Sequence, residues 1–63
     1  MLIRDADSAR AWLRAWSGKP RRGILLAVLD GLRMAAGLAQ PQEAKRIGEA
    51  VRVLEKNEGA IRP

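Results

Sequence analysis

The longest apolar run in the chain spans residues 23–38 and reads GILLAVLDGLRMAAGL. Wound at about 100° per residue, it places its large apolar side chains on one broad arc, and Asp30 and Arg33 mark a narrow polar strip. We therefore predict a helix over about residues 20–39 and expect it to be the central element of the fold. Two short neighbouring helices cover only part of such an arc, and exposed apolar surface of this kind usually meets a partner.

Two amphipathic helices are predicted on either side of this run, over residues 6–17 and 41–57. Their apolar positions recur at i, i+3, i+4 and i+7, which is the spacing of one buried helical face. The stripe of the first helix is Ala9, Trp12, Leu13 and Trp16, and that of the third is Ile47, Ala50, Val51 and Leu54. No segment shows a strand signal. The pattern therefore predicts an all-α fold of three helices in a single domain, residues 1–63.

Local signals mark the helix ends. Asp5 or Asp7 is expected to cap the first helix, because a short carboxylate accepts hydrogen bonds from the free N–H groups of a first turn. Ser17 is expected at the end of that helix. Pro20 and Pro41 are expected in the first turns of the second and third helices, where the N–H group that proline lacks would have had no partner.

The small size of the domain predicts that association with a second chain stabilises it. A chain of this length buries only about 60% of its unfolded surface. It has no Cys and no His, so neither disulfides nor thiolate metal sites can stabilise it. Small scaffolds of this kind often oligomerise, most commonly as a symmetric homodimer.

Gly59 is expected to stop the third helix, with residues 1–4 forming a short arm and residues 60–63 a tail that frays.

The second helix supplies most of the candidate interface. Ala27, Gly31 and Ala35 recur every four residues and form a groove without bulk, where another backbone could come close. Ala is common throughout the chain, so composition alone also produces such a spacing. The candidate residues for an oligomer or partner interface are Trp16, Leu26, Ala27, Gly31, Met34, Ala35 and Leu38.

The charge pattern favours acidic partners. The chain has a net charge of +5 and a pI of about 11.2. Lys19, Arg21 and Arg22 gather at the start of the second helix, where the helix dipole disfavours cations. We therefore predict an anion-binding site there, with an acidic protein surface or nucleic-acid phosphate as the anion. The competing interpretation is that these three cations serve only solubility, and the sequence favours neither.

DNA binding is a second hypothesis, since the protein is small, basic and helical. Glu43 and Arg46 are charged at the positions, counted from Gly37, where a helix-turn-helix anchors its recognition helix with apolar residues, so the standard register fails. A divergent arrangement would use Lys45, Arg46 and Arg52 of the third helix. Glu49 lies among them, and a mixed face is less favourable for a groove of DNA than a uniformly basic one.

Two further interpretations concern single residues. Trp12 and Trp16 lie one turn apart on a stripe and are expected to fill the core, although one of them could instead anchor a partner. Asp30 is expected to pair with Arg33, and the outer face of the third helix to carry pairs between charges three or four residues apart.

Several classes of function are excluded. The chain lacks His, Cys, Tyr and Thr, and its acids show neither the pairing of catalytic carboxylates nor metal-ligand spacing, so we expect no enzyme, cofactor or metal site. The Gly18–Gly23 spacing lacks the Lys-Ser/Thr pair of a phosphate loop. The run 23–38 is too short and too charged to span a membrane. The N-terminus lacks the apolar stretch of a secretory signal. A cytoplasmic location is therefore the default expectation.

The sequence thus predicts a small non-enzymatic protein-interaction module, such as an adaptor, regulator or inhibitor. Its partners would be a second copy of itself and an acidic target protein. A small dimeric DNA-binding regulator is the alternative, and a structural subunit of a larger assembly is a third hypothesis.

Overall fold

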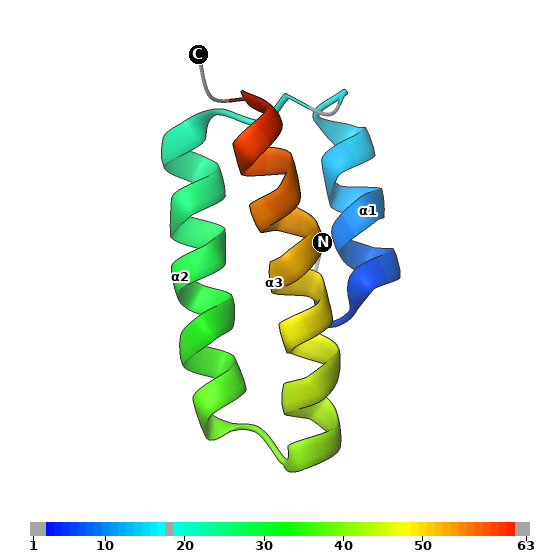
Figure 1. The fold of residues 1–63 in the computed structure, drawn as a ribbon, viewed down its shortest axis with the longest axis vertical. Helices are drawn as coiled ribbons and strands as arrows, with labels where there is room; N and C mark the ends of the chain where they lie inside the picture. Colours follow the sequence, from blue (N-terminus) through cyan, green and yellow to red (C-terminus); the bar gives the residue numbers. More distant parts are fainter. Residues whose placement is uncertain (1–2, 18, 62–63) are drawn as a thin grey trace.

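The computed structural model describes residues 3–17 and 19–61, with side chains described as far as residue 57, and it is all-α over these residues. Three helices follow one another along the chain (Figure 1): α1 (Ala6–Ala15), α2 (Arg22–Leu38) and α3 (Pro41–Ile61). Neither strand nor bridge occurs in the described part of the chain. The predicted fold class, a small three-helix domain, is therefore confirmed.

The central helix is α3 and not α2. Helix α3 packs along both α1 and α2, whereas the described backbones of α1 and α2 do not approach each other closely. The prediction that the apolar run would lie in the middle is wrong. One reason is length, because α3 has 21 residues and reaches along both neighbours, while α1 has only 10. Helix α2 therefore has a single helical neighbour.

A capping box begins α1. The Ser8 backbone N–H donates to Asp5 Oδ1 at 2.8 Å, and the Asp5 backbone N–H donates to Ser8 Oγ at 3.0 Å. Asp5 is thus the cap, one of the two residues predicted. The hydrogen bond from the Ser8 backbone holds the pKa of the Asp5 carboxyl below its usual range, because it stabilises the ionised form. The helix ends at Ala15, earlier than predicted, since Ser17 adopts a left-handed φ of 54°.

The other helix ends follow the predictions in part. Helix α3 begins at Pro41, as predicted, but α2 begins at Arg22 after an extended Arg21, so Pro20 lies outside the helix and is buried. The helix-start prediction for Pro20 is wrong because the extended residue after it delays the first turn. Helix α3 also continues through Gly59, since glycine permits a left-handed stop but does not require one.

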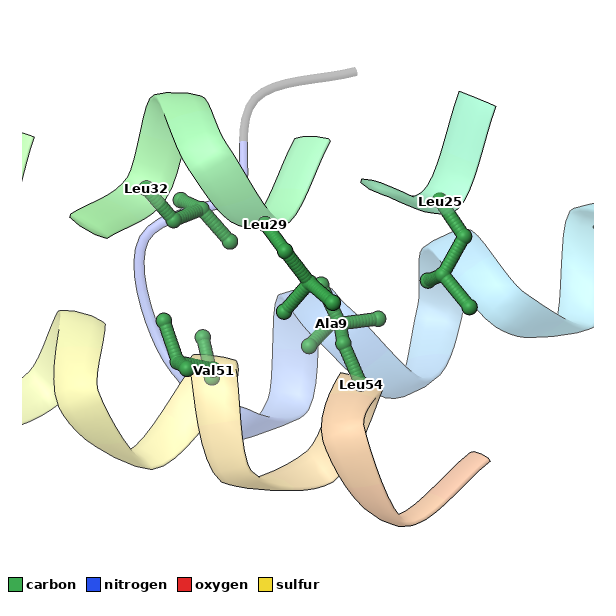
Figure 2. Close-up of a cluster of buried hydrophobic side chains, with 7 residues drawn as sticks. Ala9, Leu25, Leu29, Leu32, Val51 and Leu54 are labelled. Atoms are coloured by element: carbon green, nitrogen blue, oxygen red, sulfur yellow. The ribbon is translucent and has the colours of Figure 1, made fainter. Parts of the chain in front are cut away.

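The core is a single cluster of apolar side chains from all three helices. Its fully or nearly buried members are Ala9 of α1, Leu25, Leu29 and Leu32 of α2, and Ala50, Val51 and Leu54 of α3. Figure 2 shows that Leu29 of α2, Ala9 of α1 and Leu54 of α3 point toward one another. The predicted stripes of α1 and α3 supply this core, and no described polar or charged residue is buried in it.

The N-terminal arm contributes to this packing where it is described. Ile3 is partly buried against the core cluster. Residues 1–2 of the predicted arm and residues 62–63 of the predicted tail lie outside the described residues.

Candidate interaction surface on helix α2

Helix α2 leaves a long apolar face exposed. On a helical wheel this face lies beside the buried one, and we call it the outer α2 face. It consists of Ile24, Ala27, Gly31, Met34, Ala35 and Leu38, all exposed. Met34 is 65% exposed and Leu38 is 90% exposed. No charged residue interrupts the face along its length.

The face is exposed because α2 has only α3 to pack against. Leu25, Leu29 and Leu32 are the buried residues of α2, and they occupy one stripe of the helix. Val28 is partly buried against the same cluster. A second helix packed on the other flank of α2 would cover the outer face, but α1 packs on α3 instead. The surplus of apolar surface expected from the sequence is therefore present.

The predicted interface residues are all exposed, but they do not form one surface. Ala27, Gly31, Met34, Ala35 and Leu38 share the outer α2 face, as the wheel shows. The wheel also adds Ile24, which was not among the predicted interface residues, because it lies between positions 31 and 35 in angle.

The two remaining predicted interface residues lie elsewhere. Leu26 is 40% exposed and falls on the polar strip of α2, between Asp30 and Arg33 in angle. Trp16 is 37% exposed at the C-terminal cap of α1, while Trp12, 6.0 Å away between ring centroids, packs against the core. Trp12 therefore contributes to the core as predicted, whereas Trp16 is exposed.

The middle of the outer α2 face is open. A Cβ atom built on Gly31 meets no atom within 4 Å, so the groove that this residue forms is not filled by the chain itself. Glycine in an exposed helix interior costs about 1 kcal/mol relative to alanine. Its presence here is unexplained by packing within the domain, which makes it a clean position for testing contact with another molecule.

The predicted basic cluster borders the N-terminal end of α2. Lys19, Arg21 and Arg22 are all exposed and form no ion pair with any described carboxylate. The first turn of α2 contains no acidic residue, and its N-cap, Arg21, makes no side-chain capping bond. The end of α2 thus carries cations and free N–H groups, and no described carboxylate pairs with these cations.

The cations considered for nucleic acid lie on α3. Lys45 and Arg46 border a shallow hollow with Glu49, and a neighbouring hollow joins Lys45, Glu49 and Arg52. Lys45 and Arg46 lie near the start of α3, at the opposite end of the molecule from the α1–α2 loop that carries the basic cluster (Figure 1), whereas Arg52 lies about halfway along α3. The two groups of cations do not combine into one uniformly basic patch.

Two of the expected ion-pair patterns are not formed. Arg33 donates to Glu55 of α3 at 2.7 Å instead of pairing with Asp30, because the two helices lie side by side and bring the carboxylate within reach. The other described ion pair joins Arg10 to Asp7 within α1 at 3.0 Å. The pairs expected along the outer face of α3 are absent among the described residues, which fits the low value of exposed pairs.

No family model matches the chain, and neither a curated protein nor a solved structure matches it. Within the described part, no helix is long and apolar enough to cross a membrane. The same residues contain no group of three or more His, Cys, Asp or Glu side chains placed to hold a metal ion.

Proposed function

We propose that the protein is a non-enzymatic interaction module that binds another protein chain through the outer α2 face. The observation that carries this proposal is an uncharged apolar face, exposed along the length of a helix with a single helical neighbour. Contiguous apolar surface of this kind marks interaction sites in soluble proteins. The protein would act by joining or occluding surfaces, as an adaptor, regulator or inhibitor does.

Covering the outer α2 face with a partner contributes substantially to the free energy of binding. Burying an exposed side chain such as Met34 or Leu38 contributes about 1.5–3 kcal/mol each. These two side chains are among the most exposed large apolar groups of the domain, at 65% and 90%. The small residues between them let a partner backbone come close, which adds van der Waals contact along the whole face.

Affinity capture from the native host tests the proposal. The wild-type chain is compared with Gly31→Leu, which fills the open groove, and with Gln42→Leu as a control of the same bulk on exposed α3 surface. We expect bound proteins to be lost with the first variant and kept with the second, with and without nuclease. Identical sets of captured proteins with all three chains would contradict the proposal.

Sedimentation of the wild-type chain and of Gly31→Leu shows whether the bound chain is a second copy of the protein. A homodimer predicts that the wild-type chain sediments as a dimer at micromolar concentration and that Gly31→Leu sediments as a monomer. A stable wild-type monomer would remove the second copy from the proposal and leave a different protein as partner. In a larger assembly, the face would be covered only when that assembly forms.

DNA binding remains the alternative function, and salt dependence tests it. Neutralising Lys19, Arg21 and Arg22 would remove up to three phosphate contacts and lower the slope of log K against log salt by about 2.7. Absence of binding at low salt would end this alternative. The separation of the two cation groups argues against it, because a single DNA groove favours one continuous basic face.

A further inference from the structure

The spacing of the outer α2 face is that of a helix–helix seam. Its residues follow at positions 24, 27, 31, 34 and 38, so the steps alternate between three and four. This is the heptad repeat by which one helix packs along another. The face extends over about 21 Å, since each helical residue rises about 1.5 Å. Its length and width therefore match one partner helix of about four turns.

The charges around the face select the kind of helix. At the N-terminal end of α2, Lys19 and Arg21 precede the helix, are exposed and have no described carboxylate partner, whereas Arg22 falls on the opposite side of the helix from the outer α2 face. The face itself is uncharged, and Asp30 is the only acidic residue of α2. A partner helix with carboxylates at the end that meets these cations would be attracted, and a basic helix would be repelled.

A second copy of the chain fits this charge pattern less well. Each copy carries a net charge of +5, so the two molecules repel one another. A two-fold axis at the open Gly31 would bring the Asp30 side chains of both copies to the same level of the seam. A parallel pair would also bring the two basic ends together. Charge complementarity thus favours a different, acidic chain as occupant.

We propose that the outer α2 face binds an amphipathic helix of an acidic partner protein. The apolar residues of that helix follow the same alternating spacing, and its Asp or Glu residues lie beside Lys19 and Arg21. This inference rests on the proposed function and specifies the partner.

A displayed peptide library tests this inference without assuming a sequence. The probe is a library of helical peptides, each of about 18 residues, with leucine at the alternating seam positions. Its remaining positions are randomised among Glu, Lys, Gln and Ala, and it is selected on the full chain. We expect selected peptides to carry Glu toward one end and Lys nowhere near that end.

Binding of the selected peptides is then measured with variants. Gly31→Leu is expected to weaken binding about tenfold or more, because the added side chain blocks close approach. A double change of Lys19 and Arg21 to Gln is expected to weaken it roughly 2- to 30-fold at low salt. Met34→Glu provides a second variant on exposed surface in case Gly31→Leu alters the fold, and circular dichroism of each variant checks its helicity.

The possible outcomes separate this inference from the proposed function. Selected peptides that lack acidic residues but still lose binding with Gly31→Leu and Met34→Glu would overturn the acidic partner and keep the docking face. Peptides insensitive to both variants, or no peptides at all, would overturn the inference and count against the face itself. A wild-type dimer that Gly31→Leu dissociates would overturn the inference in favour of a second copy.

Discussion

Two adjacent leucines of α2 provide a matched test of the packing. Leu25 is fully buried between the helices, whereas Leu26 is 40% exposed on the polar strip. Replacing the buried side chain with alanine is expected to cost about 2–5 kcal/mol, from lost burial and the cavity left behind. The same change one residue later is expected to cost less than about 1 kcal/mol, and alanine's better helix propensity offsets part of that.

The magnitude of this difference is large for so small a domain. At about 0.05–0.15 kcal/mol per residue, the whole chain of 63 residues has a stability of roughly 3–9 kcal/mol. Leu25→Ala is therefore expected to remove much of it, and Leu26→Ala very little. Both changes have the same effect on side-chain chemistry and lie in the same turn, so burial is the main variable between them.

Urea denaturation followed by the helical circular dichroism signal measures both variants. With a slope of about 1 kcal/mol per molar urea, the buried change is expected to lower the midpoint by roughly 2 M or to leave no folded baseline. The exposed change is expected to shift it by less than about 1 M. Equal shifts in the two variants, or a larger one for Leu26→Ala, would refute the orientation of α2 on α3.

Three further predictions concern Ser17, which follows the C-terminal cap of α1, Asp5, which is its N-terminal cap, and Asn57 of α3. Ser17→Gly is expected to raise the stability by about 0.5–1 kcal/mol in thermal melts, because glycine adopts the left-handed φ of 54° without steric cost; a lower melting temperature would contradict this. Asp5→Ala is expected to lower the melting temperature near neutral pH. Since the folded pKa of Asp5 is depressed, its contribution is present above the unfolded pKa and fades as the pH falls below about 4, so the two melting curves should converge in acid. Asn57→Leu is expected to be neutral or to stabilise by about 1 kcal/mol in urea titration, because the buried Asn57 Nδ2 has no hydrogen-bond partner among the described residues; a clear loss of stability would show that the amide has a role in the fold.

Sequence periodicity predicted the three helices and most of the buried stripes of α1 and α3 correctly, whereas Trp16 of the α1 stripe is exposed. The positions Ala9, Ala50, Val51 and Leu54 lie in the core because they repeat at the spacing of one helical face. The cap at Asp5 was also predictable, since a short acidic side chain preceding a helix satisfies its free N–H groups. These features depend on local chemistry, which the sequence displays directly.

The arrangement of the helices could not be read in the same way. Apolar content suggested that α2 would be central, but the neighbours of a helix depend on the lengths and directions of all three helices. The ion pair between Arg33 and Glu55 illustrates the same limit, because these residues are 22 positions apart and meet only through the packing of α2 on α3. Arg33 pairs with Glu55 and not with Asp30, although Asp30 is closer in the sequence, because the fold brings the Glu55 carboxylate within reach.

The candidate surface was predictable in composition but not in shape. Exposure of Met34, Leu38 and the small residues between them was expected from the width of the apolar arc. The sequence could not assign Ile24 to the exposed edge, nor separate Leu26 from the rest, because both decisions depend on the direction in which α3 lies. Once the position of α3 beside α2 is known, both residues can be assigned.

Site-specific photo-crosslinking in the native host tests the central claim most directly. A photoreactive residue replaces Met34 on the outer α2 face, and in a control chain it replaces Lys45 on exposed α3 surface. We predict a discrete protein adduct from the α2 position that disappears when Gly31→Leu is added, and no such adduct from the α3 position. Equal adducts from both positions, or an α2 adduct indifferent to Gly31→Leu, would contradict the assignment of this face as the binding surface.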